Sequence, residues 1–226
     1  MHKIELAVFD MAGTVVNEDN VVYKTLQKAI NKKGYDLSLN FVLEHGAGKE
    51  KHQAIKDTLK AIDKFEEEPS QPIFEDFKVM LDQAYENLQV GTFKGVEETL
   101  LFLKKNGIKV AFNTGYNKKI ASLLLEKMNW KQGEQYDVLV TADDAKNGRP
   151  APDMILEAMK QLDVIEASKV LKAGDSIIDI EEGKNAKCGV TVGVTTGAHT
   201  KAQLDSANPT YVLESLSHLK ELVKKS

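Results

Sequence analysis

Acidic, hydroxyl and guanidinium side chains stand where predicted strands of this chain end, or one loop beyond. They are Asp10, Thr114, Arg149, Asp175 and Asp179. The carboxyl ends of parallel strands meet at one edge of an open α/β sheet, which is where such sheets bind ligands. Carboxylates gathered at this edge repel one another unless a cation lies among them, and oxygen ligands suit Mg²⁺. Because a guanidinium and a hydroxyl at the same edge suit a phosphoryl group, this set of side chains predicts phosphoryl transfer.

The first predicted strand delivers the first of these side chains. Residues 4–9 form a short apolar run that predicts a buried strand ending at Asp10, and Gly13 indicates a tight turn directly afterwards. We expect the backbone N–H groups of Gly13 and Thr14, and those of the helix after Gly115, to donate to a bound anion. Each residue taken alone has a structural explanation, such as a turn or a helix cap. Their succession at the ends of consecutive strands favours a functional site.

The composition limits the classes of protein and partner. The chain has 226 residues, 42% hydrophobic and 28% charged, which is enough for a sizeable core with a smaller insertion. A formal net charge of −4 and a sequence pI of about 5.8 disfavour nucleic acid as a partner. The single cysteine, Cys188, excludes an intramolecular disulfide and fits a cytoplasmic location. The apolar run at the N-terminus is too short for a signal peptide or a membrane span.

A helical segment follows the first predicted strand. Between positions 73 and 88 apolar residues recur at intervals of three and four, which is the period of an amphipathic helix. A helical period also begins at Val21, and a second predicted helix carries Ile55 and Leu59. We therefore expect residues 16–91 to form an all-helical cap domain inserted after the first strand.

Strands and helices alternate through the rest of the chain. Apolar runs predict strands at 108–112, 137–141, 169–173, 190–194 and near 211–213, with helical spacing between them. Such alternation implies parallel strands joined by right-handed crossovers. The predicted fold class is α/β: a Rossmann-like, doubly wound parallel sheet core, residues 1–15 and 92–226, with the inserted all-helical cap domain.

At these residues the chain resembles the haloacid dehalogenase superfamily over nearly its whole length. The four motifs of that superfamily are matched, in chain order, by Asp10 with Gly13 and Thr14, by Thr114, by Arg149 and by residues 174–179. The resemblance implies an aspartate nucleophile, Asp10, that forms a phosphoaspartyl intermediate with the help of Mg²⁺. It also implies that the helical insertion is the cap that this superfamily places after its first motif.

The resemblance further implies how the magnesium ion is held. Its ligands would be the Asp10 carboxylate, the backbone carbonyl of Ala12 and Asp175. Asp179 would act nearby, either directly or through water. Thr114 and Arg149 would contact the phosphoryl group.

Ala12 is an informative departure from the superfamily pattern. Ordinary phosphatases of the superfamily carry a second aspartate two positions after the nucleophile, which protonates the leaving group, and alanine has no proton to give. The sequence Asp-x-Ala-Gly-Thr resembles the phosphonatase, or phosphonoacetaldehyde hydrolase, branch. Further matches to that branch are Thr114-Gly115-Tyr116 and residues 148–152.

In that branch a cap lysine forms a Schiff base with the substrate aldehyde, and the matching position here is Lys49. His52 follows three residues later and is a candidate for substrate binding. A protonated lysine is a poor nucleophile, and burial or a neighbouring cation such as Lys51 favours the neutral amine. The alternative is that Lys49 is a solvated or phosphate-facing cation of the cap.

Three functions remain open at this point. The first is a Mg²⁺-dependent hydrolase of a small phosphorylated or phosphono metabolite, with phosphonoacetaldehyde as the sharpest substrate prediction. The second is a phosphomonoesterase of the phosphoglycolate phosphatase type. The third is a phosphate-metabolite binding protein without turnover. The resemblance also implies that two chains can pair as a homodimer through the cap. The net charge and the short N-terminal apolar run predict no nucleic acid and no membrane partner.

Overall fold

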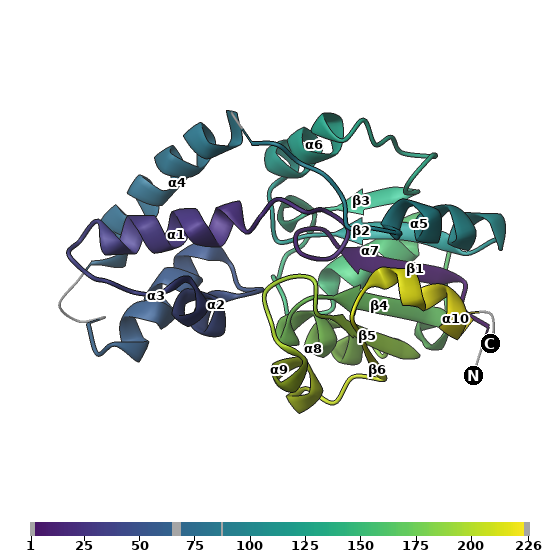
Figure 1. Cartoon of the computed structure of the whole chain (residues 1–226). Coiled ribbons are helices and arrows are strands. Elements are labelled where there is room, and N and C mark those ends of the chain that lie inside the picture. Colours follow the sequence, from purple (N-terminus) through teal and green to yellow (C-terminus); the bar gives the residue numbers. More distant parts are fainter. Residues whose placement is uncertain (1–2, 65–68, 87, 224–226) are drawn as a thin grey trace. The chain divides into compact units, whose positions relative to one another are not determined.

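The structure, a computed structural model, describes residues 3–64, 69–86 and 88–223. The chain divides into two compact units (Figure 1). One unit contains the residues up to Asn17 together with those from Val90 onward, and the other is Glu18–Gln89.

The first unit contains a six-stranded sheet in the order β3-β2-β1-β4-β5-β6, in which all neighbouring strands are parallel. The strands are β1 Leu6–Asp10, β2 Lys109–Asn113, β3 Val138–Val140, β4 Val170–Gly174, β5 Val190–Val194 and β6 Tyr211–Leu213. From β1 the chain first builds the β2 side of the sheet and then crosses to the β4 side. This reversal beside β1 is the point at which doubly wound sheets bind ligands.

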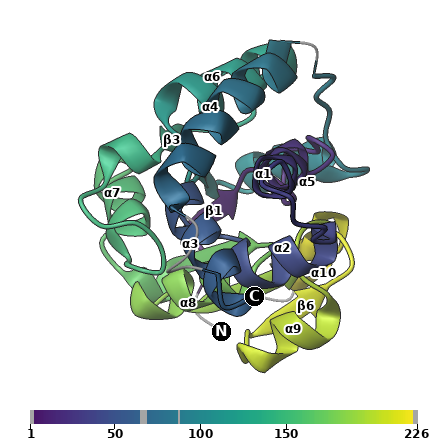
Figure 2. The same ribbon diagram turned by 90° about the vertical axis from the view of Figure 1, so that its left-hand side faces the viewer.

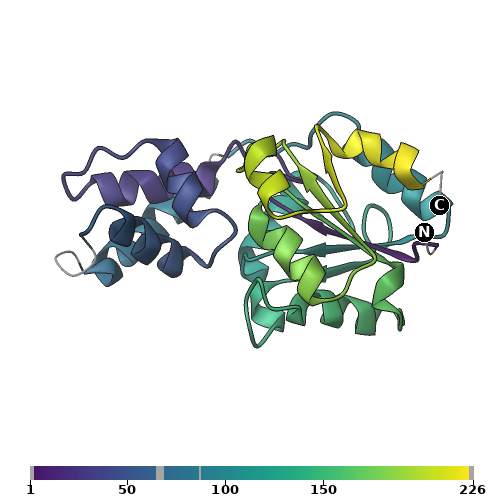
Figure 3. The same ribbon diagram turned by 90° about the horizontal axis from the view of Figure 1, so that it is seen from below.

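Helices cover both faces of this sheet. They are α5 Val96–Lys105, α6 Lys118–Lys127, α7 Asp153–Gln161, α8 Ile177–Asn185, α9 Lys201–Ser206 and α10 Leu219–Val223. Figure 3 shows the green helices α7 and α8 on one side of the sheet and the yellow helix α10 on the other. Every residue of β1 is buried, because a central parallel strand is covered on both faces, and this explains its continuous apolar sequence. The predicted α/β fold class is confirmed.

Two strands extend one residue further than predicted. Asn113 pairs with Asp10 at the end of β2, and Gly174 pairs with Gly193 at the end of β4. The sequence pattern missed these residues because neither is apolar or β-branched. Parallel pairing with the neighbouring strand holds them in the sheet.

The second unit consists of α1 Val21–Asn31, α2 Leu39–Gly46, α3 Lys51–Ala61 and α4 Ser70–Glu86. Helix α1 packs on α4, and α2 packs on α3 (Figure 2). Helix α2 could not be predicted from the sequence, because its eight residues are too few for a clear period. It begins where the Ser38 side chain accepts a hydrogen bond from the Phe41 N–H. None of the helices in the described parts of the chain combines the length and apolar character that crossing a bilayer requires.

Candidate active site

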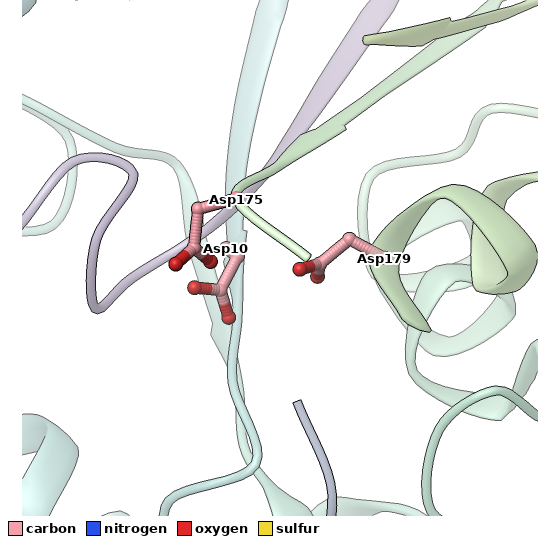
Figure 4. A group of neighbouring side chains, drawn as sticks. All are labelled: Asp10, Asp175 and Asp179. Carbon is pink, nitrogen blue, oxygen red and sulfur yellow. The ribbon is translucent and has the colours of Figure 1, made fainter. Parts of the chain in front are cut away.

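Three buried aspartates converge where β1 and β4 end. Asp10 is the last residue of β1, Asp175 directly follows β4, and Asp179 lies in the first turn of α8. Each has a carboxylate oxygen within 4.8 Å of the other two. Figure 4 shows the carboxylates of Asp10 and Asp175 close together, with Asp179 pointing toward them from α8. The predicted meeting of these side chains follows from the sheet, because β1 and β4 are neighbours.

Arg149 bridges two of the aspartates. Its Nη2 atom lies 2.6 Å from Asp10 Oδ1, and its Nη1 atom lies 2.8 Å from Asp179 Oδ1. Nη2 also donates to the backbone carbonyl of Asn113 at 2.9 Å. The side chain is only 4% exposed, and it is the only arginine among the 30 lysine and arginine residues of the chain.

Burial and mutual repulsion determine how the three carboxyl groups titrate. Burial raises the pKa of Asp175 well above its ordinary value, and the charges of Asp10 and Asp179 raise it further. Burial also raises the pKa of Asp10, against the opposing effect of Arg149. Burial acts on Asp179 in the same direction, but Lys172 and Arg149 outweigh it and lower the pKa of this carboxyl. The group therefore has an excess of negative charge that a bound cation would relieve.

Two glycines make room for the Asp175 carboxylate. A Cβ atom added to Gly13 would lie 2.3 Å from Asp175 Oδ2, and one added to Gly197 would lie 2.0 Å from the same oxygen. The Ala198 N–H donates to this oxygen at 2.6 Å, and the Thr196 hydroxyl donates to the Gly13 carbonyl at 2.6 Å. The loop after β5 is therefore joined to the loop after β1 around Asp175.

The backbone donors expected after Asp10 are used inside their own turn. The Gly13 N–H donates to Val16 O at 2.9 Å, and the Thr14 N–H donates to Met11 O at 3.2 Å. In this conformation of the loop both N–H groups therefore have acceptors within the turn, and their contact with an anion stays a prediction. The Thr14 hydroxyl is different: it is buried and has no hydrogen-bond partner among the described residues. This hydroxyl is therefore available to donate a hydrogen bond to a bound anion.

The region after β2 shows a similar difference. Thr114 is buried beside Asn113, the residue that pairs with Asp10, and its side chain accepts a hydrogen bond from the Tyr116 N–H at 3.2 Å. Gly115 is exposed, and α6 begins only at Lys118. The N–H of Lys118 already donates to an Asp143 carboxylate oxygen. The expected anion-binding helix start after Gly115 is therefore capped by the chain itself.

Lys49 and His52 belong to the second unit, where both have partners. Lys49 Nζ lies 2.5 Å from Asp57 Oδ2 in a partly buried ion pair. The His52 Nε2 atom lies 3.0 Å from the Ser70 hydroxyl oxygen, and the ring stacks on Phe74 with centroids 4.9 Å apart. Both side chains are thus oriented by contacts within their own unit.

Three buried polar residues near the aspartates escaped the sequence analysis: Asn113, Lys172 and Glu182. Lys172 Nζ lies 3.0 Å from Asp179 Oδ1 and 3.1 Å from Glu182 Oε2. The sequence held one signal for it, a lysine within the apolar strand Val170–Gly174. Glu182 follows Asp179 by three residues on α8, so both project from the same side of that helix.

The donor set fits a hard divalent cation. The three carboxylates have oxygens within 4.8 Å of one another, and two of them have raised pKa values. Carboxylate oxygens are the ligands that Mg²⁺ prefers. Asp179 differs from the others because its Oδ1 faces Arg149 and Lys172, and its Oδ2 accepts from the Ser176 hydroxyl at 2.6 Å. Asp10 and Asp175 are therefore better placed than Asp179 to give oxygens to a metal.

Comparison with known proteins assigns the chain to a family. The model of the haloacid dehalogenase-like hydrolase family matches residues 7–193. Phosphonoacetaldehyde hydrolase of Bacillus cereus (strain G9842) is 29% identical over 209 residues, which cover 87% of this chain and 77% of that protein. A phosphonoacetaldehyde hydrolase from Parabacteroides distasonis is 36% identical over 131 residues, 58% of this chain and 49% of that protein.

Solved structures share the fold. A phosphonoacetaldehyde hydrolase-like protein from Oleispira antarctica superposes with a TM-score of 0.84 at 22% identity, covering 99% of this chain and 92% of that chain. A predicted phosphoglycolate phosphatase from Haemophilus somnus superposes with a TM-score of 0.77 at 21% identity, covering 98% of this chain and 99% of that chain.

Proposed function

The chain belongs to the haloacid dehalogenase-like hydrolase family, and from this premise we propose that it is a Mg²⁺-dependent hydrolase of a small phosphorylated or phosphono metabolite. The observation that carries the proposal is the buried group of Asp10, Asp175 and Asp179 with Arg149 bridging two of its members. Phosphoryl transfer is favoured where a nucleophile, a guanidinium and a metal cation lie close together. Asp10 supplies the nucleophile, Arg149 supplies the guanidinium, and the aspartates supply ligands for the cation.

Asp10 is the proposed nucleophile. Its carboxylate oxygen forms a bond to phosphorus while the bond from phosphorus to the leaving group breaks, and the leaving group keeps the electron pair. Arg149 and Thr114 contact the phosphoryl oxygens and stabilise the charge that develops on them. Water then attacks the phosphoaspartyl group, which releases phosphate and restores the Asp10 carboxylate.

Asp10, the Ala12 carbonyl and Asp175 are the proposed magnesium ligands, and Asp179 acts directly or through water. Bound Mg²⁺ would supply positive charge that offsets the negative charge of the phosphoryl group. Thr14, Gly13 and Gly115 are proposed to line the phosphate position. The Thr14 hydroxyl is the best supported of these three, because it is buried and has no partner among the described residues.

Phosphonoacetaldehyde remains the proposed substrate. Ala12 cannot protonate an alkoxide leaving group, and a curated relative whose match covers 87% of this chain is a phosphonoacetaldehyde hydrolase. The Lys49 amine condenses with the aldehyde to give an imine and water. When phosphorus is transferred to Asp10, the electron pair of the C–P bond enters the imine, and protonation of that carbon followed by hydrolysis frees the lysine. His52 is proposed to contact the substrate.

For this step, Asp57 must release Lys49, because only a neutral amine attacks a carbonyl. Loss of the Lys49 proton therefore precedes imine formation. If instead Lys49 stays paired with Asp57, the proposed activity is that of a phosphomonoesterase.

Domain roles and assembly complete the proposal. Residues 1–15 and 92–226 form the catalytic core domain, and residues 16–91 form the cap domain that selects the substrate. Pairing of two chains through their caps gives a homodimer, and the enzyme acts in the cytoplasm on a small molecule. A sedimentation mass equal to one chain would contradict the dimer.

A panel of phosphate esters and phosphonates, assayed with and without Mg²⁺, tests the proposal. We expect phosphate release from phosphonoacetaldehyde only with Mg²⁺, and none from Asp10→Asn. Borohydride added with phosphonoacetaldehyde should leave a covalent adduct on Lys49 that mass spectrometry locates. Turnover of phosphoglycolate without such an adduct would favour the phosphomonoesterase. Binding of substrates without any phosphate release would leave only the binding protein.

A further inference from the structure

Lys172 and Glu182 form a buried ion pair for which the proposed reaction has no step. Lys172 lies within β4 and is 1% exposed, and Glu182 lies on α8 and is 0% exposed. Taking two charges out of water is costly, and apolar side chains of similar volume often stabilise a protein as well or better. Stability of the fold is therefore a weak explanation for these charges.

Three acceptors hold the Lys172 ammonium. They are Asn113 Oδ1 at 2.6 Å, Asp179 Oδ1 at 3.0 Å and Glu182 Oε2 at 3.1 Å. The ammonium therefore has a hydrogen bond to Asn113 Oδ1 and two carboxylate oxygens at ion-pair distance. The backbone also confines this side chain: a Cβ atom added to Gly183 of α8 would lie 3.0 Å from Lys172 Cβ, so the helix and the strand are in close contact here.

Glu182 is held from the opposite side as well. The Asn113 amide nitrogen donates to Glu182 Oε1 at 2.8 Å and to Oε2 at 3.0 Å. Asn113 thus accepts from Lys172 and donates to Glu182, which closes a ring of three side chains. The Glu182 carboxylate cannot turn without breaking several of these contacts.

The guanidinium of Arg149 lies next to the Glu182 carboxylate of this ring of three side chains. Its Nε atom lies 3.4 Å from Glu182 Oε2, an ion-pair distance without a hydrogen bond, while Nη1 faces Asp179 and Nη2 faces Asp10. A guanidinium is planar and rigid, so a contact at Nε helps to determine where both Nη atoms lie. Glu182 touches neither Asp10 nor the proposed phosphate position in any contact described here, and its route to the reaction is through Arg149.

We propose that Glu182 is a positioning residue that orients Arg149 against the nucleophile, and that Lys172 and Asn113 hold Glu182 in place. The proposal rests on the proposed function in one respect, the contact of Arg149 with the phosphoryl group. A catalytic group displaced by about 1 Å can lower the rate on the order of 10²-fold, so loss of Glu182 acts on turnover while leaving Mg²⁺ ligands intact.

The single arginine of the chain permits a direct test without substrate. A ¹⁵N-labelled sample has one arginine Nε–H signal, which must come from Arg149. We expect slow solvent exchange of this proton in the native protein, because the Arg149 side chain is only 4% exposed. In Glu182→Gln we expect at least 10-fold faster exchange, because the guanidinium is no longer held in its buried position. Lys104→Met is the matched control, because it removes a lysine from another partly buried ion pair, with Asp137, in the same unit. It should leave the arginine signal unchanged.

A double-mutant cycle with Arg149→Lys then tests the connection to the reaction. Glu182→Gln should lower kcat at least 10-fold when Arg149 is present, but less than 2-fold in the Arg149→Lys background, since lysine has no fork to orient. Equal factors in both backgrounds, or an unchanged arginine signal, would overturn the proposal. If Glu182→Gln does not fold, Glu182→Asp keeps the charge with a shorter reach and carries the same expectations. Absence of turnover in the native protein with the expected exchange result would reject the proposed function and leave the positioning role standing.

Discussion

Replacement of Gly197 by alanine tests whether the position of the Asp175 carboxylate matters for the reaction. The added Cβ atom would lie 2.0 Å from Asp175 Oδ2 and 2.6 Å from its Cγ. An ordinary contact is no shorter than about 3.4 Å, so the carboxylate must move by about 1.4 Å or the loop after β5 must retreat by a similar distance. Backbone strain does not complicate the substitution, because Gly197 is absent from the glycines with positive φ.

A displacement of this size has a predictable effect on turnover. Misplacing a reacting or metal-binding group by about 1 Å can reduce the rate on the order of 10²-fold, which corresponds to about 2.7 kcal/mol of transition-state stabilisation. We expect Gly197→Ala to lower kcat by this factor and to raise the Mg²⁺ concentration needed for half-maximal activity. The Thr196 hydroxyl bond to the Gly13 carbonyl is expected to weaken as well, because both residues belong to the loops that enclose Asp175.

The assay is steady-state phosphate release over a range of Mg²⁺ concentrations, together with a thermal melt. Gly91→Ala is the matched control, because a Cβ atom added at Gly91 meets nothing within 4 Å and that residue has no positive φ. The control should retain native kcat and Mg²⁺ dependence. Native kcat and native Mg²⁺ dependence in a Gly197→Ala protein whose crystal structure shows a displaced Asp175 carboxylate would refute the role assigned to Asp175.

Four further predictions follow from the same geometry. Asp175→Asn should abolish Mg²⁺ activation while the melting temperature stays equal or rises, since a repelling charge with a raised pKa is removed; activation at native Mg²⁺ concentrations would contradict this. Thr14→Val should lower kcat/KM about 10-fold with little loss of stability, as its hydroxyl has no partner among the described residues. Butanedione, which modifies arginine, should inactivate the enzyme through Arg149 alone, and inorganic phosphate with Mg²⁺ should slow the inactivation. Burial raises the pKa of Glu18 to about 7 from 4.5, so its contribution to stability is present below pH 4.5 and is lost as pH rises through 7. Between pH 4.5 and pH 7 the free energy of unfolding of the native protein, measured with urea, should therefore include a decrease of about 3 kcal/mol that is missing in Glu18→Gln.

Local sequence was sufficient to predict much of the fold. Strands of a parallel sheet are apolar along their length and helices repeat every three to four residues, so the alternation after residue 95 could be recognised from short windows. The same reasoning brought Asp10, Arg149, Asp175 and Asp179 to one edge, because all follow strands that end there. The helix Leu39–Gly46 was missed because two turns are too few to show a period.

Polar residues inside elements were harder to interpret from sequence. Lys172 interrupts an apolar strand, and a single interruption carries no information about its partners. Asn113 and Glu182 lie 59 and 10 residues away from Lys172 in the chain. Only the pairing of β1 with both β2 and β4, together with the packing of α8 on β4, brings the three together. Long-range contacts of this kind are set by the register of the sheet, which no local pattern records.

The sequence by itself determined the chemistry available at the end of β1: a carboxylate, a glycine turn, a hydroxyl, and an alanine at position 12 that has no proton to give. Tertiary structure decided which of these groups are free to act. The Gly13 and Thr14 N–H groups are used within their turn, whereas the Thr14 hydroxyl is not, because buried backbone donors find partners in the nearest carbonyls. It also decided the charge on the three aspartates, since burial and the nearby cations act only at distances that the folded chain creates.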